Sequence, residues 1–302
     1  MYRQYDQAAL DAQYNLRARH PDYEDYSRRW DQEGERVRRE LECKLDVRFD
    51  PAPGATLDVF PAREAGAPLL LFIHGGYWQW RDKRDFSFLA EAPVNAGFSV
   101  VVNNYDLAPT VTLDEIVRQN RAALAWIYKN AESCNGDRSR IVVSGHSAGG
   151  HLTAMLAATD WIAWGKEIGE ELPADPILGA CAISGLYDLE PLRLCYLNEA
   201  LRLDEAGAYR NSPLHHLPDR GPPLVVAVGG DETEEFLRHS AEFAAAWAGG
   251  SPDGQAGRSG LEGEHLVLPG LNHFSILDDL GRPEGALLQT IMRLAQAEPA
   301  TG

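Results

Sequence analysis

Short apolar runs alternate along the chain with longer segments in which apolar residues recur every three or four positions. The run at residues 68–73 (PLLLFI) has no polar side chain, which is typical of a strand buried on both faces of a sheet. Runs of this kind, and two short segments that flank a turn, predict strands at residues 45–49, 56–60, 68–73, 98–103, 141–144, 177–183, 223–228 and 265–268.

Segments with helical periodicity separate most of these strands. They predict helices at residues 22–45, 86–95, 113–131, 148–157, 233–247 and 285–295. Strands that alternate with helices form βαβ units, in which helices cover both faces of a mostly parallel sheet. The pattern therefore predicts the α/β fold class.

Three stretches stand outside this alternation. Residues 1–44, rich in charge, Tyr and Arg, predict an N-terminal helical arm that lies on the main domain. Residues 189–217 have no clear period and predict a small cap over an active site. Residues 249–263 are rich in Gly and Ser and predict an exposed loop. A length of 302 residues suits one α/β domain better than two, so we expect a single domain over residues 1–302.

The composition is that of an ordinary globular protein, with 44% apolar and 24% charged residues. No apolar run reaches the roughly 18 residues of a membrane helix, and the N-terminal segment lacks the apolar core of a signal peptide. We therefore expect a cytoplasmic protein. The formal net charge of −17 disfavours nucleic acid and anionic membranes as partners, because both would repel the chain. We expect a small-molecule substrate, and the oligomeric state stays open, a homodimer included.

The four cysteines are Cys43, Cys134, Cys181 and Cys195, and they form no CxxC pair. Isolated cysteines in a chain without a secretory signal are usually reduced and packed. These cysteines therefore predict no disulfide and no metal site. We also expect no cofactor.

The strongest chemical signal is Gly145-His146-Ser147-Ala148-Gly149, which matches G-x-S-x-G. It follows the strand predicted at residues 141–144 and leads directly into the helix at residues 148–157. A nucleophilic serine needs this context, since a tight turn between strand and helix projects its hydroxyl above the sheet. The pattern predicts Ser147 as the nucleophile.

A second signal, His74-Gly75-Gly76-Tyr77-Trp78, follows the strand at residues 68–73. In esterases, an HGG turn at this place supplies backbone N–H groups that stabilise the oxyanion of the tetrahedral intermediate. We expect the donors to be Gly75 or Gly76, together with Ala148. We expect His74 to hold the loop by a side-chain hydrogen bond.

The acid and the base of such a triad follow late strands, in the chain order Ser, Asp, His. Asp231 follows the strand at residues 223–228, and His273 follows the strand at residues 265–268. The spacing predicts that His273 takes the proton of Ser147 while Asp231 orients the imidazole. Asp188 is an alternative acid.

Other histidines and several aromatic residues are further candidates for the same region. His151 is expected to pack in the core, and His215 and His216 to lie on a solvated cap. An aromatic wall for a flat substrate is a further hypothesis, with Trp78 and Trp80 beside the oxyanion turn and Trp161 and Trp164 after the nucleophile helix. The expected substrate contacts are Tyr77, Trp78, Trp161 and Phe274.

With these motifs in place, the sequence resembles the kynurenine formamidase (arylformamidase) family of α/β-hydrolases. The similarity lies in His74-Gly75-Gly76-Tyr77-Trp78-Gln79, in Gly145 to Leu152, and in the intervening Asn104-Tyr105-Asp106-Leu107-Ala108-Pro109. It implies the α/β-hydrolase fold and cleavage of an N-formyl aryl amide, such as N-formylkynurenine, to the amine and formate.

Two alternatives remain at this point: a carboxylesterase that acts on short-chain acyl or aryl esters, and a relative without catalysis that binds a ligand. The amino-acid head of kynurenine would need charged partners, and Arg193, Arg202 and Arg210 are candidates for its carboxylate.

Overall fold

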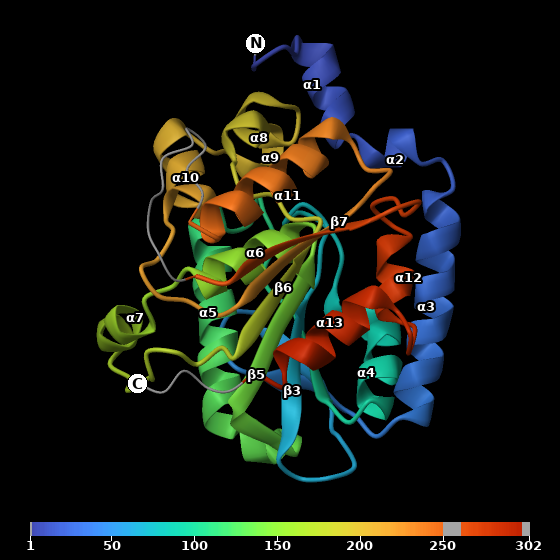
Figure 1. Ribbon diagram of the computed structural model, residues 1–302, viewed down its shortest axis with the longest axis vertical. Coiled ribbons are helices and arrows are strands. Elements are labelled where there is room, and N and C mark those ends of the chain that lie inside the picture. The colour runs from blue at the N-terminus through green and yellow to red at the C-terminus, as the bar shows by residue number, and fades with distance from the viewer. Residues whose placement is uncertain (1, 250–260, 298–302) are drawn as a thin grey trace.

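The architecture is a single twisted sheet with helices on both faces (Figure 1). The computed structural model describes residues 2–249 and 261–297, so most of the loop expected at residues 249–263 lies outside the described residues. The strands are β1 (Lys44–Arg48), β2 (Thr56–Phe60), β3 (Ala67–Ile73), β4 (Ser99–Asn103), β5 (Gly136–His146), β6 (Gly179–Ile183), β7 (Leu224–Gly229) and β8 (Gly263–Leu268). Each predicted strand is present, which confirms the predicted α/β fold class.

The strand order in the sheet is β1-β2-β4-β3-β5-β6-β7-β8. β2 pairs antiparallel with both β1 and β4, and every pairing from β4 to β8 is parallel. The carboxyl ends of β3 and β5 to β8 therefore meet at one edge of the sheet, where open α/β sheets bind their ligands.

The helices include long elements that cover the sheet and short elements at its carboxyl edge. They are α1 (Gln7–Tyr14), α2 (Leu16–Arg19), α3 (Tyr23–Glu40), η1 (Lys83–Ala90), α4 (Glu91–Asn95), α5 (Leu113–Asn130), η2 (Ala131–Cys134), α6 (Ala148–Ala157), α7 (Trp161–Ile168), α8 (Glu190–Leu194), α9 (Asn198–Leu201), α10 (Glu205–Arg210), η3 (Pro213–His215), α11 (Glu234–Trp247), α12 (Ile276–Leu280) and α13 (Ala286–Leu294). The segment expected to form a cap thus folds as α8, α9, α10 and η3.

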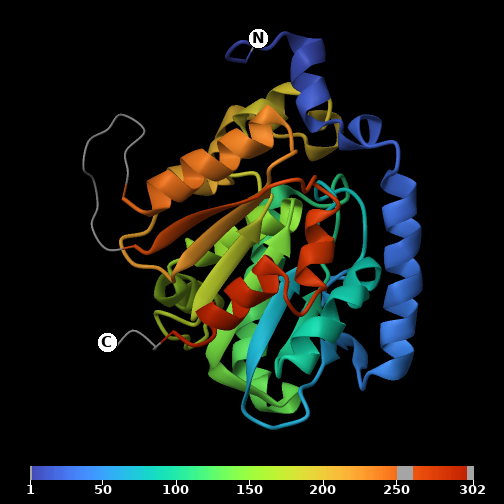
Figure 2. The ribbon, with the colours of Figure 1, turned by 45° about the vertical axis from the view of Figure 1, so that its right-hand side comes forward.

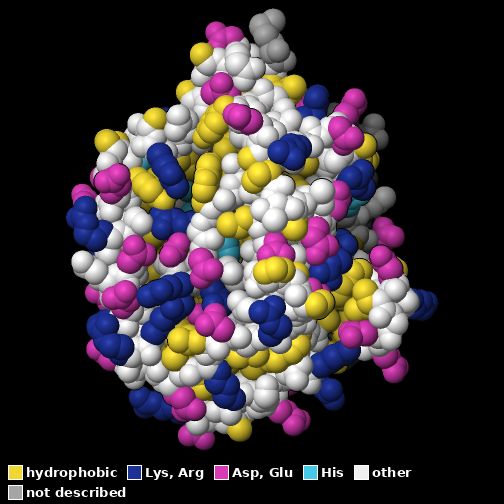
Figure 3. Space-filling view, turned by 180° about the vertical axis from the view of Figure 1, so that it is seen from behind, with side chains coloured by type: hydrophobic (Ala, Val, Ile, Leu, Met, Phe, Trp, Pro, Cys, Tyr) yellow, Lys and Arg dark blue, Asp and Glu magenta, His cyan; other side chains and the backbone are white. Residues whose placement is uncertain are grey.

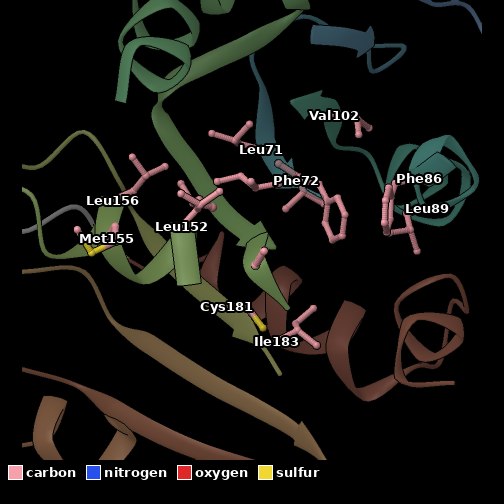
Figure 4. Close-up of a cluster of buried hydrophobic side chains, with 14 of the residues drawn as sticks. Leu71, Phe72, Phe86, Leu89, Val102, Leu152, Met155, Leu156, Cys181 and Ile183 are labelled. Carbon is pink, nitrogen blue, oxygen red and sulfur yellow. The ribbon is translucent and has the colours of Figure 1, made fainter. Parts of the chain in front are cut away.

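The core lies on both faces of the sheet because side chains alternate along each strand. Figure 4 shows Leu71 of β3 on the side of the α6 residue Leu152, and its neighbour Phe72 on the opposite side, against Phe86 of η1. The ring centroids of Phe72 and Phe86 are 5.9 Å apart. A strand buried on both sides in this way reads as an unbroken apolar run in the sequence.

The N-terminal arm, residues 2–40, wraps around the molecule from the top of the sheet along one side (Figures 1 and 2). At one end, the hydroxyl of buried Tyr14 donates to Glu235 of α11 over 2.9 Å. Further along, the indole N–H of Trp30 in α3 donates to Asp278 of α12 over 3.3 Å. These contacts attach the arm to elements that follow late strands.

The described helices include none that is long and apolar enough to cross a membrane. On the face shown in Figure 3, acidic and basic side chains are interspersed and do not gather into an area of one sign.

The packing of α6 predicts a clear difference in stability between two Leu→Ala variants. Leu156 is fully buried, whereas Leu45 of β1 is 43% exposed. We expect Leu156→Ala to lower the free energy of unfolding by about 3–5 kcal/mol, because it leaves a cavity in the core. Leu45→Ala should change it by less than about 0.5 kcal/mol. Urea denaturation measures both, and equal losses would contradict this packing.

Candidate active site

Ser147 occupies the sharp turn that joins β5 to α6. Its φ of 58° and ψ of −117° are outside the usual regions for a residue with a side chain, as the strained turn of a nucleophilic serine requires. A Cβ atom on Gly145 would overlap the carbonyl of Gly149, and a Cβ atom on Gly149 would overlap the carbonyl of Ile73. Both glycines of the motif are therefore needed for the close approach of α6 to β3.

The hydrogen bonds around Ser147 fix its backbone at the end of the sheet. Its N–H donates to the carbonyl of Ile183 over 2.9 Å, and its carbonyl accepts from the N–H of His151 over 3.0 Å. Ala148 opens α6, so its N–H has no acceptor within the helix and is available to a developing oxyanion.

The HGG turn passes directly beside the nucleophile. A Cβ atom built on Gly75 would lie 3.0 Å from the Cβ atom of Ser147, which shows how closely the two segments approach. Gly76 has a φ of +114°, and a side chain there would overlap the carbonyl of Trp80. Gly75 and Gly76 thus stand where oxyanion donors are needed. The assignment of an oxyanion donor to Gly75 or Gly76 stays a prediction.

His74 holds this turn in place, as predicted from the sequence. Its ring lies 2.8 Å from the Gly75 carbonyl and 3.0 Å from Oδ1 of Asn104, and it stacks on Tyr105 with 4.3 Å between ring centroids. Burial lowers the pKa of His74. The hydroxyl of Tyr105 donates to the His74 carbonyl over 2.9 Å, so this side chain braces the same turn.

The acid beside His273 is Glu232, and the expectation of Asp231 is wrong. Oε2 of Glu232 accepts a 2.6 Å hydrogen bond from Nδ1 of His273. Oε1 of the same carboxylate accepts from the hydroxyl of Ser184 over 2.5 Å and from the N–H of Gly229 over 2.9 Å. With Nδ1 bound to the acid, the Nε2 atom of His273 is the nitrogen left for Ser147.

The physical reason for the correction lies in the turn after β7. The N–H of Glu232 donates to the carbonyl of Gly229 over 3.2 Å, and this turn brings Glu232 back under the strand end with its side chain buried. Asp231, one residue earlier, is exposed. The alternative acid, Asp188, accepts from the hydroxyl of Tyr2 over 3.0 Å and belongs to the attachment of the N-terminal arm.

The loop that carries His273 is fixed by the histidine of the nucleophile motif. Nε2 of His146 donates to the carbonyl of His273 over 2.8 Å. Burial, with a smaller contribution from His273, holds the pKa of His146 well below its usual range. His146 is therefore neutral, and it acts as a structural link between the segments of the nucleophile and the base.

Ser147 and His273 face one cavity of about 650 Å³, including its open mouth. Its lining residues come from the N-terminal arm, the HGG turn, η1, the cap and the segment after β8; they are Tyr14, Asn15, Leu16, Arg17, Tyr23, Trp30, Gly75, Gly76, Tyr77, Trp80, Arg81, Phe86, His146, Ser147, Tyr196, His273, Phe274 and Leu277.

Two of the four expected substrate contacts line this cavity, and two do not. Tyr77 and Phe274 are in the lining, and their contact with substrate stays a prediction. Trp78 is wrongly assigned, because it is fully buried behind the turn with its edge against His151. Trp161 is also wrongly assigned, since it begins α7, is absent from the cavity lining and packs on Trp164.

His151, His215 and His216 have structural contacts. His151 is buried, as expected, and its Nε2 lies 2.7 Å from the carbonyl of Asn211; burial lowers its pKa to about 4. His215 stacks on Tyr209 of α10, and Nε2 of the exposed His216 lies 3.0 Å from the Tyr209 carbonyl. Neither is part of the cavity lining.

The arginines expected to bind a carboxylate do not line the cavity either. Arg193 pairs with Glu190 over 2.6 Å, and Arg210 pairs with Asp114 over 2.9 Å. Arg202 lies with Arg210 along a separate hollow next to the cap.

The four cysteines are free, and three of them are buried. Across residues 2–249 and 261–297, no group of three or more His, Cys, Asp or Glu side chains is placed to hold a metal ion. The expectation that no cofactor is needed stays a prediction.

The largest contribution that the sequence did not reveal comes from the N-terminal arm. Its helical character was expected, but not its place in the cavity wall, to which Tyr14, Asn15, Leu16, Arg17, Tyr23 and Trp30 contribute. The amphipathic pattern of α3 signals that one face is buried. It does not say against which part of the chain.

Comparisons with known proteins agree with this geometry. The sequence model of the BD-FAE family matches residues 57–172, which include the HGG turn and the nucleophile motif. A kynurenine formamidase from Salmo salar is 31% identical over 267 residues, which cover 86% of this chain and 84% of that protein. Esterase LipQ from Mycobacterium tuberculosis is 28% identical over 63% of this chain and 47% of its own length.

Solved structures share the whole fold. The crystal structure of a protein from Silicibacter sp. TM1040, described as a thioesterase, superposes with a TM-score of 0.79 at 29% identity. The match covers 94% of this chain and 98% of that one.

The position of the acid predicts opposite outcomes for two neighbouring substitutions. Glu232→Gln should lower kcat by about 10³–10⁴-fold, because the neutral amide can hold the wrong imidazole tautomer and cannot stabilise the imidazolium. Asp231→Asn removes the same charge from an exposed side chain and should change kcat by less than about twofold. Steady-state hydrolysis of p-nitrophenyl acetate measures both. Circular dichroism verifies that each variant is folded, and a large loss in Asp231→Asn alone would restore Asp231 as the acid.

Proposed function

The chain belongs to the kynurenine formamidase family of α/β-hydrolases, and we propose that it is a serine hydrolase that cleaves N-formyl aryl amides, with N-formylkynurenine as the prototype substrate. The observation that supports this most strongly is the one cavity in which the Ser147 hydroxyl, the Glu232-bound imidazole of His273 and an aromatic wall come together. The substantial identity to the Salmo salar formamidase over most of both chains supports the same substrate class.

The shape of the site suits a small acyl group and a large leaving group. The backbone of Gly75 packs against Ser147, and this leaves little room beside the nucleophile. A formyl carbon carries only a hydrogen on its acyl side, so it fits such a place. The lining of the cavity also includes the rings of Tyr23, Trp80 and Phe274, which suit a flat aryl amine.

In the proposed reaction, Oγ of Ser147 attacks the formyl carbon while Nε2 of His273 takes the hydroxyl proton. The carboxylate of Glu232 stabilises the imidazolium that forms. The oxyanion is held by the N–H of Ala148 and that of Gly75 or Gly76. His273 then gives its proton to the departing aryl amine. Water attacks the formyl-enzyme through the same groups, which releases formate and restores Ser147.

A carboxylesterase that acts on short-chain acyl or aryl esters is the second candidate, because the same groups cleave esters. The similarity to esterase LipQ favours it, although that match covers less of both chains. The leaving group decides between the two, since an ester releases an alcohol or phenol where the formamide releases an amine.

We also propose that the enzyme acts in the cytoplasm on a small molecule, without a nucleic-acid or membrane partner. The four free cysteines support a reducing compartment. The net charge of −17 and the interspersed charges on the face in Figure 3 support the absence of polyanionic partners. All the proposed catalytic groups come from one chain, so the reaction does not require a homodimer.

The substrate class can be tested by a direct comparison of rates. We expect kcat/KM for N-formylkynurenine to exceed that for p-nitrophenyl acetate by about tenfold or more, because the larger substrate uses more of the cavity to stabilise the transition state. Ser147→Ala should lower both rates by about 10⁶-fold. Absorbance of released kynurenine and of p-nitrophenolate provides the readouts. A faster rate on the ester would favour the carboxylesterase, and full activity of Ser147→Ala would exclude both.

A further inference from the structure

Arg17 places a positive charge at the wall of the catalytic cavity. It lies in the short helix α2 of the N-terminal arm, and its side chain is one of the two cationic side chains in the lining, Arg17 and Arg81. Its neighbours in the lining include Trp80 and Tyr196, which are 40% and 41% exposed. Since Ser147 and His273 are buried, these exposed residues mark the mouth of the cavity, and Arg17 stands there.

The guanidinium of Arg17 is held by aromatic rings. Its central carbon lies 4.9 Å from the ring centroid of Tyr23 and 5.1 Å from that of Trp80. Contacts of this kind attract a cation to the ring face and leave the N–H groups at the guanidinium edge unused. Those N–H groups can then donate as a pair to a planar carboxylate.

The two cationic side chains of the lining differ in their partners. Arg81 is committed to the protein, because it pairs with Asp85 over 3.4 Å and donates to the hydroxyls of Ser27 and Tyr23. For Arg17, by contrast, the part of the chain that the structure describes offers neither an ion pair nor a hydrogen bond to the guanidinium.

The backbone next to Arg17 is fixed to both sides of the cavity. The carbonyl of Tyr14 accepts from the hydroxyl of Tyr77 over 2.9 Å and from the hydroxyl of Tyr196 over 3.3 Å. The side chain of Asn15 then accepts from the N–H of Ala18 and caps α2. The arm thus presents Arg17 from a backbone that is tied to the HGG turn and to the cap.

We infer that Arg17 is a specificity-determining residue that binds a carboxylate on the leaving group of the substrate. The inference rests on the proposed function and extends it from aryl formamides in general to those whose amine carries an anionic group. The formyl group reaches Ser147 at the buried end, the aryl ring lies along the aromatic wall, and the carboxylate meets Arg17 at the mouth. The arm then binds the carboxylate of the leaving group, whereas residues on the turns that follow the strands cleave the formamide bond.

The test compares Arg17→Gln with Arg19→Gln, which removes the same charge from the same helix but at a residue outside the cavity lining. The substrates are N-formylkynurenine and its carboxamide, which lacks only the negative charge. Arg17→Gln should lower kcat/KM for N-formylkynurenine by about 10–100-fold, mainly through KM, since a hydrogen-bonded charge pair is lost. It should change kcat/KM for the carboxamide by less than about twofold, and Arg19→Gln should have small effects on both.

Several results would overturn the inference: an equal loss on both substrates, no loss on either, or the same selective loss in Arg19→Gln. The unchanged rate on the carboxamide also shows that Arg17→Gln is folded.

Failure of the proposed function gives a different result, because wild-type enzyme would then hydrolyse neither formamide. In that case the ratio of variant to wild-type rates is measured on 4-acetoxybenzoate and 4-acetoxybenzamide. A selective loss on the benzoate supports the role of Arg17, and equal ratios exclude it.

Discussion

The carboxylate of Glu232 is removed from water, and the arrangement of the active site depends on the donors that surround it. Its oxygens accept from the hydroxyl of Ser184, the N–H of Gly229 and Nδ1 of His273. A buried carboxylate is costly unless such donors are present, so the three groups must stay together for the fold to be stable. Because Ser184 follows β6, Gly229 ends β7 and His273 follows β8, this one requirement fixes the positions of three strand ends relative to the base.

The topology of the sheet explains why these distant residues meet. The parallel pairings from β4 to β8 place all the carboxyl ends on one edge, and the Ser147 N–H bonds the carbonyl of Ile183 at the end of β6. His146 then connects this turn to the carbonyl of His273. The nucleophile and the base are thus linked twice. One link runs through the end of β6, where the Ser184 hydroxyl donates to the carboxylate that holds His273, and the other runs through the neutral ring of His146. Preorganisation of this kind allows the charge to develop without rearrangement of the protein.

The sheet and the nucleophile could be predicted because their physical causes are local in sequence. Each buried strand is an apolar run, and the glycines of the nucleophile motif are required by the close packing of α6 on β3. The acid could not be chosen in this way, since Asp231 and Glu232 are both carboxylates after the same strand. The choice depends on the turn at Gly229, which buries the second residue, and on the extra methylene of glutamate that extends its carboxylate toward His273. Neither effect changes the hydrophobic pattern.

This contrast between local and tertiary causes also separates the proposed catalytic residues from the residues that would select the substrate. The residues proposed to cleave the bond lie on turns whose geometry only a few side chains tolerate, so they leave a recognisable motif in the sequence. Several residues that line the cavity around the proposed leaving group come from the N-terminal arm, where Tyr14, Arg17 and Tyr23 belong to helices with no distinctive motif. Their contribution follows from the attachment of the arm to the HGG turn and to α11, which is a tertiary property. An alteration in the arm could therefore change the substrate of such an enzyme while every catalytic motif remained intact.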